Sequence, residues 1–372
     1  MDKNFQGGML MQIIQDRRAL HQIPEIGLEL PKTMEYVLQS LSGLNCRVLT
    51  PVGCAVCAFF DFGADSTIAF RADMDALPIP ENSSAPYAST HPGQMHACGH
   101  DGHTAILLEL ARRLSEKEKL PHNVLLIFQP AEEPTLGAEQ ICETGILEQY
   151  RVKAIFGLHL WPMLEKGKLF TRKKALMARA CEVDIEITGR SAHIGKASEG
   201  LDALDAGAQI YTQVRELEKA LPEDVYRILN FGFFQSGTVR NAISAKTVLQ
   251  GSMRSYEPEI HDYLQTGLKR IVREVCEKTG CTAQVHITKG SPAVINPPEL
   301  VDAVSRLLPL ELLPEPSLTA EDFSVYQQRV PGVFFFLGLG DGPALHSVNF
   351  DFDEAVLKKG ADFFEELAEK YI

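Results

Sequence analysis

Three short apolar segments, each followed by side chains that can bind a metal ion or a proton, most constrain what this chain can fold into. The segments are residues 66–72, 123–129 and 154–158. The side chains that follow them are, in the same order, Asp73 and Asp75, Glu132 and Glu133, and His159. Buried strands with polar residues at their carboxyl ends are typical of an α/β sheet, where those ends meet at one edge. We therefore expect one shared site at that edge.

The segment Met95–His103 indicates what such a site would bind. It holds three histidines together with Cys98 and Asp101, and an apolar pattern of helical period follows over residues 104–114. Thiolate and imidazole groups at a loop-to-helix junction are ligands that transition metals prefer. A polar loop with unrelated histidines is the alternative. Because further acids and imidazoles recur downstream, the pattern favours a metal site.

Five side chains from separate parts of the chain are the candidate ligands. They are Cys98, His100, Glu133, His159 and His346. One catalytic zinc usually keeps about three protein ligands and an open position, so five exceed its needs. Two metal ions that share a bridging ligand fit the set better. Such a pair activates a water molecule and polarises a carbonyl group.

Carboxylates next to these ligands are candidates for proton transfer and for orientation. Glu132 adjoins Glu133 after a buried strand, and a turn there can bring both near one centre. Glu133 would bind metal, while Glu132 would take a proton from the attacking water and hand it to the leaving nitrogen. Asp75 would orient a ligand from behind, and Asp73 is a second candidate for that role. Two unrelated surface acids are the alternative for the glutamate pair, which the preceding strand and Pro130 disfavour.

A different pattern predicts an inserted domain. Strict alternation over residues 181–188 predicts a strand with one exposed face, and the elements after it follow the order β-α-β-β-α-β. That order is typical of a ferredoxin-like unit. After Pro297-Pro298 the chain returns to helices and apolar strands. We therefore expect a discontinuous first domain, residues 1–178 and 291–372, with residues 179–290 inserted.

The inserted segment carries two polar clusters that could contact a substrate. His193 follows a strand end and could stabilise a developing oxyanion. Arg240 and Asn241 could hold a carboxylate or a carbonyl group. Considered without further information, each of the three is more simply explained as an ordinary loop residue.

Charge and composition exclude some classes of partner. The 372 residues carry a formal net charge of -13, which argues against nucleic acid or an anionic membrane because either needs a basic face. No signal-peptide pattern and no apolar run of membrane-spanning length is present, and the eight cysteines are scattered. We therefore expect a cytoplasmic protein whose thiols are mostly free.

Eight parts of the sequence, which span nearly the whole chain, match one known family in the family's order. They are Arg71–Pro78, His96–His103, Phe128–Glu133, Gly157–His159, Gly189–His193, Gly237–Asn241, Thr319–Phe323 and His346. In these parts the sequence resembles the dinuclear metal amidohydrolases of the aminoacylase class, in the M20 metallopeptidase family. It is most similar to the branch of N-acyl-amino-acid amidohydrolases, hippurate hydrolase, auxin-conjugate hydrolases and N-acetyldiaminopimelate deacetylase.

The resemblance implies a mixed-sheet α/β/α catalytic domain like that of zinc peptidases, with an inserted ferredoxin-like α+β lid domain. It implies two divalent ions per subunit, zinc or manganese with cobalt or nickel as alternatives. Cys98 would bridge them, in the place that an Asp holds in peptidase relatives. Glu132 would be the general base and acid, with Asp75 behind the metal site. His193 would reach the active site of the partner subunit in a homodimer formed through the lid domain.

The activity that the resemblance implies is hydrolysis of an N-acetyl or aromatic N-acyl amino acid to a carboxylic acid and a free amino acid. A dipeptidase or aminopeptidase of the same fold is the first alternative, and Cys98 points away from it. A non-catalytic binding relative is the second, and Glu132 argues against it because such a protein needs no base. Pro134–Gly137 departs from the family pattern and leaves the substrate open. His103 and Glu321-Asp322 fit the pattern without an assigned role.

Overall fold

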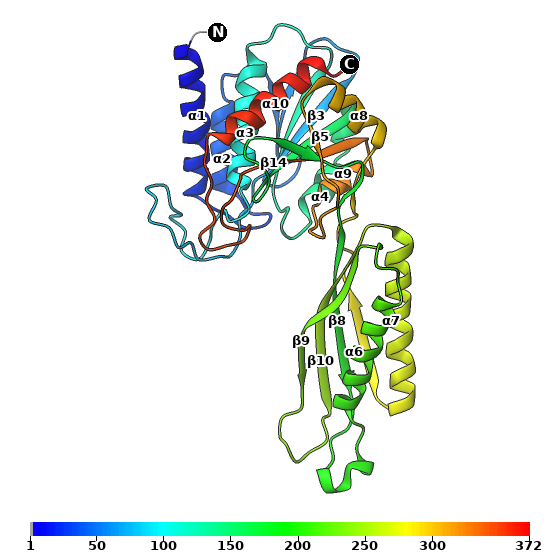
Figure 1. The fold of residues 1–372 in the computed structure, drawn as a ribbon. Helices are drawn as coiled ribbons and strands as arrows, with labels where there is room; N and C mark the ends of the chain where they lie inside the picture. The colour runs from blue at the N-terminus through cyan, green and yellow to red at the C-terminus, as the bar shows by residue number, and fades with distance from the viewer. Residues whose placement is uncertain (1–2) are drawn as a thin grey trace. The chain divides into compact units, whose positions relative to one another are not determined.

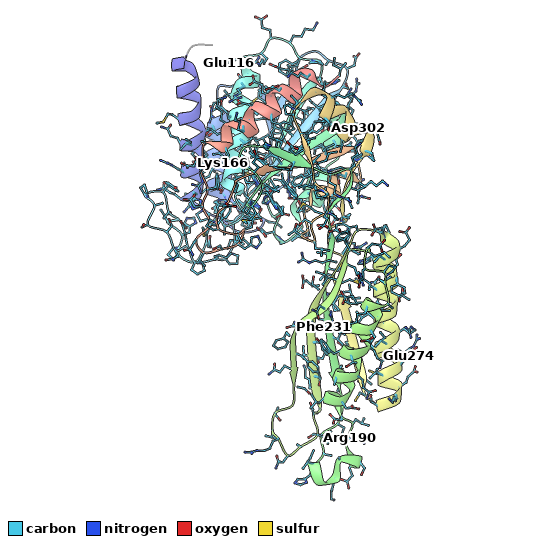
Figure 2. All side chains as sticks on the ribbon, viewed as in Figure 1. Glu116, Lys166, Arg190, Phe231, Glu274 and Asp302 are labelled. Carbon is cyan, nitrogen blue, oxygen red and sulfur yellow. The ribbon has the colours of Figure 1, made fainter. Side chains whose placement is uncertain are left out.

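The structure is a computed structural model that describes residues 3–372, with side chains described from residue 11 onward (Figures 1 and 2). The chain divides into two compact units. The first comprises residues through 176, 294–316 and 321–372, and the second comprises residues 177–293 and 317–320. Segment 317–320 groups with the second unit because Ala178 donates its N–H to Thr319 O and Arg254 donates to Leu318 O.

A mixed eight-stranded sheet forms the centre of the first unit, with the strand order β1-β2-β4-β3-β5-β14-β6-β13. Strands β3, β4, β5 and β14 run parallel to their neighbours within this group. Every residue of β3, β4 and β14 is buried, as expected for parallel strands covered on both faces. The strands are β1 Arg47–Leu49, β2 Val56–Phe60, β3 Thr67–Asp73, β4 Asn123–Gln129, β5 Val152–Trp161, β6 Leu169–Thr171, β13 Glu311–Leu312 and β14 Gly332–Gly338.

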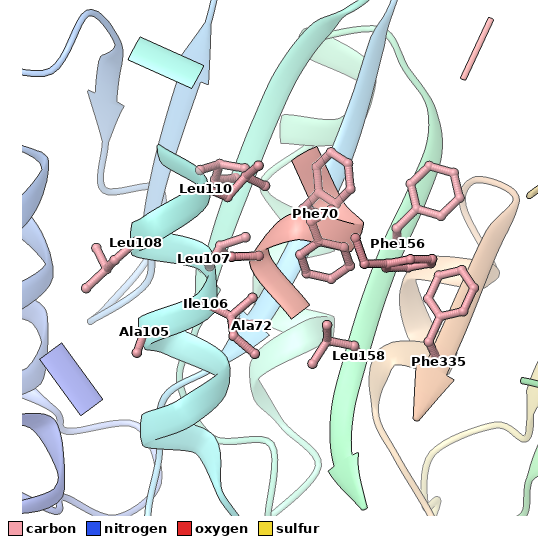
Figure 3. Packing of buried hydrophobic residues seen from close by; sticks show 14 of the residues in the cluster. Phe70, Ala72, Ala105, Ile106, Leu107, Leu108, Leu110, Phe156, Leu158 and Phe335 are labelled. Atoms are coloured by element: carbon pink, nitrogen blue, oxygen red, sulfur yellow. The ribbon is translucent and has the colours of Figure 1, made fainter. Parts of the chain in front are cut away.

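Helices pack against this sheet, and α3 is the most deeply buried of them. Its residues Ile106, Leu107 and Leu110 lie in one core cluster with Phe70 of β3 and Phe156 of β5 (Figure 3). Helices α1 and α10 pack against α3, and α4 packs against α9. The helices are α1 Lys3–His21, α2 Pro31–Leu41, α3 His100–Ser115, α4 Gly137–Glu143, α5 Ile146–Gln149, α8 Pro298–Leu307, α9 Phe323–Gln327 and α10 Val356–Lys370.

The second unit is a four-stranded antiparallel sheet with two helices. Its elements follow the predicted ferredoxin-like order β-α-β-β-α-β along the chain, and the strand order within its sheet is β11-β8-β10-β9. The buried face of β8 packs with α6 and α7 in a core of its own. The elements are β8 Arg179–Thr188, the 3-10 helix η1 Ile194–Glu199, α6 Ala203–Lys219, β9 Arg227–Ser236, β10 Lys246–Ser255, α7 Pro258–Thr279 and β11 Thr282–Ile287. A two-stranded sheet of β7 Lys174–Met177 and β12 Val294–Asn296 lies where the chain leaves and rejoins the first unit.

The expected α/β class and the inserted ferredoxin-like unit are confirmed, and one expectation about a strand end is wrong. His159 does not follow its strand, because β5 continues to Trp161. Leu160 and Trp161 remain paired with Leu337 and Gly338 of β14, so the ladder extends past the histidine. Helix α3 also begins earlier than expected, at His100.

Among residues 3–372, the structure contains no helix that could span a bilayer. The eight cysteines are free thiols, and Cys98 is among the buried ones.

Candidate metal centre

The five candidate ligands lie together in the first unit, in two groups that share one thiol. Cys98 belongs to a group with His100 and His159, and also to a group with Glu133 and His346. Within each group the potential ligand atoms lie within 4.8 Å of one another. Cys98 Sγ is 3.4 Å from His159 Nε2, and His346 Nε2 is 3.5 Å from Glu133 Oε1. Cys98 is the residue that the two groups share, which is the position that a ligand common to two metal ions would occupy.

The turn between Cys98 and His100 lets both side chains enter the site. Gly99 has a φ of 89°, a left-handed conformation that a residue without a Cβ adopts readily. Three residues later, a Cβ on Gly102 would lie 2.6 Å from Leu160 Cδ1. The first turn of α3 therefore packs directly on β5, the strand that carries His159.

The turn after β4 places both glutamates, and Asp75 holds that turn. Ala131 has a φ of 56°, which bends the chain immediately before Glu132. Asp75 accepts the backbone N–H of Glu132 at 3.0 Å and that of Glu133 at 3.2 Å. Asp75 Oδ1 also lies 3.4 Å from His100 Nδ1, so the carboxylate is next to a candidate ligand.

Buried polar atoms without partners fit the binding of metal ions at this place. Both ring nitrogens of His100 are buried and lack a hydrogen-bond partner among the described residues. Leaving such a group unsatisfied costs about 1–3 kcal/mol, which coordination would offset. His159 is also presented as a ligand, because its Nδ1 donates to Leu160 O at 2.7 Å and leaves Nε2 facing Cys98. Thiolate, imidazole and carboxylate donors are those that zinc and similar divalent ions bind.

Charge and burial alter the proton affinities of these groups. Hydrogen bonds with Cys98 and Glu133 raise the pKa of His346 to about 10. Burial raises the pKa of the Cys98 thiol. In the metal-free protein, both groups therefore tend to keep their protons at neutral pH, and a metal ion must displace those protons to bind.

Glu132 lies beside the ligands in an environment that favours its protonated form. Its side chain is buried, and its carboxylate oxygens form a group with Glu321 and Asp322 within 4.8 Å. Burial, together with the charges of Glu321 and Asp322, raises the pKa of Glu132 well above its usual range. A carboxyl group tuned in this direction suits a general acid or base that works near neutral pH.

The three predicted substrate-binding residues belong to the second unit. His193, Arg240 and Asn241 are all exposed. His193 pairs with Ala242 in an isolated β-bridge, and Ile194 donates its N–H to Asn241 O at 2.9 Å. The structure therefore brings His193 and Asn241 together in one loop region, and their role toward a substrate stays a prediction.

Sequence reasoning missed Arg71, whose side chain is fully buried and paired with three carboxylates. The available signal was an arginine inside an apolar strand segment, since a buried charge requires partners. The structure also shows the contacts of His103, for which the sequence indicated no role. Its Nδ1 is 2.6 Å from Asp73 Oδ1, and its Nε2 accepts the N–H of Leu160 at 2.9 Å.

Comparison with known proteins identifies the family. Residues 69–370 match the model of peptidase family M20/M25/M40. An uncharacterized hydrolase of Staphylococcus haemolyticus is 34% identical over 374 residues, which cover 96% of this chain and 98% of that protein. A crystal structure from methicillin-resistant Staphylococcus aureus is similar with a TM-score of 0.91 and 27% identity, covering 98% of this chain and 97% of that one. A Bacillus subtilis protein described as a dinuclear metal binding peptidase of family M20 has a TM-score of 0.85 and 30% identity over 97% of this chain and 98% of that one. The chain is therefore a metal-dependent hydrolase that belongs to peptidase family M20/M25/M40.

Proposed function

We propose that this protein hydrolyses the amide bond of N-acyl amino acids that carry an N-acetyl or aromatic acyl group. The products would be a carboxylic acid and a free amino acid. The observation that carries the proposal is the position of Cys98, which both groups of ligand atoms share. By the resemblance described above, a thiol at this position is typical of the amidohydrolase branch, whereas an Asp is typical of the peptidases.

Two divalent ions, when bound, would supply polarisation of the amide carbonyl and a lowered pKa for water. Cys98, His100 and His159 would hold one ion, and Cys98 with Glu133 and His346 would hold the other. Zinc or manganese suits this mixture of sulfur, nitrogen and oxygen donors, with cobalt or nickel as alternatives.

Glu132 would transfer the proton that the reaction requires. The water oxygen adds to the carbonyl carbon while Glu132 accepts a proton from that water. Glu132 then gives the proton to the amide nitrogen, so that the C–N bond breaks and a neutral amine leaves. Because Asp75 binds the backbone N–H of Glu132, the base is held beside the ligands throughout.

Residues of the second unit would complete substrate binding in a homodimer. Arg240 or Asn241 would hold the α-carboxylate, and His193 would stabilise the oxyanion in the active site of the other copy. Edge strand β9 supports the dimer, because it exposes Phe233 and Phe234, at 43% and 41%, at an unpaired edge of the sheet. Tyr211 of α6 lies near Phe234, with ring centroids 6.4 Å apart. An exposed aromatic edge strand is a surface that a second copy can cover.

A peptidase is the second candidate, since the similar Bacillus subtilis protein is described as one. An assay distinguishes the two candidate functions. The protein is supplied with zinc, manganese and cobalt in turn, and is tested on N-acetyl and N-benzoyl amino acids and on dipeptides and tripeptides. We expect cleavage of the N-acyl amino acids. Cleavage restricted to peptides with a free amino terminus would overturn the proposed substrate class in favour of the peptidase.

A further inference from the structure

Arg71 is a buried cation that contacts four side chains in the first unit. Its Nε donates to Gln129 Oε1 at 2.8 Å, and its Nη1 donates to Asp73 Oδ2 at 2.7 Å. Its Nη2 donates to Asp322 Oδ1 at 2.8 Å and lies 3.1 Å from Glu321 Oε1. The Arg71 side chain has no exposed surface.

Such an arrangement is costly to bury and serves geometry better than stability. Removing a guanidinium and three carboxylates from water costs several kcal/mol for each ion, and apolar packing often stabilises a core equally well. The planar fork of Arg71 directs each N–H at a different acceptor, which a lysine ammonium cannot do with the same geometry. The contacts of Arg71 therefore restrict the positions of the acceptors around it.

One branch of this network leads to the candidate ligands. Asp73 uses Oδ2 to accept from Arg71 and Oδ1 to contact His103 Nδ1 at 2.6 Å. His103 Nε2 in turn accepts the N–H of Leu160 at 2.9 Å, directly after the ligand His159. Asp73 Oδ2 also lies 3.8 Å from Nε2 of the ligand His100. The branch thus connects β3, α3 and β5 around one half of the metal centre.

The other branch leads to the surroundings of Glu132. Gln129 ends β4, three residues before Glu132, and its Nε2 donates to both oxygens of Asp322 at 2.9 and 2.8 Å. Glu321 Oε1 accepts the N–H of Phe323 at 3.0 Å as well as facing Arg71. Carboxylate oxygens of Glu321 and Asp322 lie within 4.8 Å of an oxygen of Glu132. The side chains of Glu321 and Asp322 therefore lie directly beside the carboxyl group of Glu132.

We propose that Arg71 is the positioning residue of the metal centre. Through Asp73 and His103, its guanidinium positions the candidate ligands His100 and His159. Through Gln129, Glu321 and Asp322, it positions Glu132. The network also gives Glu321 and Asp322 a role, which is to set the position of Glu132. The part that concerns Glu132 rests on the proposed function, whereas the part that concerns the ligands requires only metal binding.

The test compares Arg71→Lys with Arg113→Lys in the full-length protein. The control is matched, because Arg113 is also buried and donates to Glu109 at 2.9 Å, Asp362 at 2.9 Å and Glu365 at 3.0 Å at the last turn of α3. Both variants keep a positive charge and lose the fork. Cobalt titration, followed by the visible bands and the thiolate charge-transfer band, reports the affinity and the ligand geometry without any substrate.

We expect Arg71→Lys to weaken cobalt binding about tenfold or more and to alter the cobalt spectrum, as loss of groups that orient ligands does. We also expect kcat to fall more than KM rises. Arg113→Lys should lower the thermal midpoint while leaving cobalt affinity, spectrum and kcat unchanged. A cobalt affinity of Arg71→Lys within twofold of the wild-type affinity, together with an unchanged cobalt spectrum, would overturn the proposal.

Two milder variants keep the proposal testable if Arg71→Lys does not fold. Asp73→Asn interrupts the branch to the ligands and should weaken cobalt binding. Glu321→Gln keeps an acceptor for Phe323 and should lower kcat while cobalt affinity is retained. Loss of thermal stability in both, with no effect on cobalt binding or kcat, would overturn the assignment. A wild-type protein that binds two cobalt ions but cleaves no N-acyl amino acid contradicts the proposed function alone, and the cobalt comparison would still decide the role of Arg71.

Discussion

Asp75 accepts the backbone N–H of Glu132 at 3.0 Å, so the candidate general base is held by a carboxylate that also faces a ligand. The same carboxylate lies 3.4 Å from His100 Nδ1 and accepts the N–H of Glu133 at 3.2 Å. Asp75, on the loop after β3, therefore contacts both candidate ligands, His100 and Glu133, as well as the candidate base.

Replacing Asp75 should impair metal binding and turnover together. In Asp75→Asn one side-chain oxygen remains, so only one of the two backbone N–H groups keeps a good acceptor. We expect metal affinity to fall about tenfold to 100-fold. Isothermal titration with zinc measures this. Asp65→Asn, at an exposed residue of the same unit, is the control. Unchanged affinity in Asp75→Asn would mean that Asp75 does not orient His100.

Metal binding should release protons and strengthen as the pH rises. Burial raises the pKa of Cys98, and hydrogen bonds raise the pKa of His346 to about 10, so both groups are protonated in the metal-free protein at neutral pH. Metal ions compete with those protons. Calorimetry in buffers of different ionisation enthalpy counts the protons released. Binding without proton release would contradict the ligand roles of these two residues.

The raised pKa of His346 predicts that the metal-free protein becomes less stable as the pH rises, although metal binding strengthens over the same range. The folded-state pKa of His346, about 10, exceeds the unfolded value of about 6.5. Its contribution to stability is therefore fully present below the unfolded pKa and is lost as the pH rises through the folded one. Thermal midpoints measured from pH 6 upward in a chelator should fall in the wild type more than in His346→Ala. Equal pH dependence in the two proteins would exclude this contribution.

Cys98 is expected to matter for both metal ions because both ligand groups contain it. Cys98→Ser should weaken binding at both sites and remove the thiolate charge-transfer band of the cobalt protein. Cys46→Ser, at a half-buried free thiol, is the control and should keep the band. If Cys98→Ser lost only one metal ion and left the affinity of the other unchanged, the thiol would not be a bridge.

The packing of α3 on β5 can be tested at Gly102. A Cβ there would lie 2.6 Å from Leu160 Cδ1 and 3.0 Å from Phe352 Cζ, so Gly102→Ala forces neighbours apart. Overpacking of this kind costs about 1–3 kcal/mol in the free energy of unfolding. Gly342→Ala, where a Cβ meets nothing within 4 Å, should have little effect on denaturant unfolding. Similar stability of the two variants would show that the helix can move away from β5 without cost.

Local patterns in the sequence predicted the main elements and the candidate ligands. The candidate ligands could be predicted because their residue types bind metals and their neighbours have clear apolar patterns. Cys98 and His100 lie at the start of a helix, and Glu133 follows a buried strand. The place of His159 inside β5 could not be predicted, because it depends on pairing with β14 across the sheet. The partners of Arg71 were equally hidden, since Asp322 is 251 residues away and only the folded chain path brings it near.

The most direct test of the account measures bound metal and turnover in the same sample of Glu132→Gln. Glu143→Gln, at an exposed residue of the same unit, is the control. The account predicts two metal ions per subunit in both variants, and a kcat on N-acetyl or N-benzoyl amino acids that falls about 100-fold to 10,000-fold only in Glu132→Gln. Retained turnover in Glu132→Gln with two metal ions bound would contradict the role of Glu132 as the proton-transferring group.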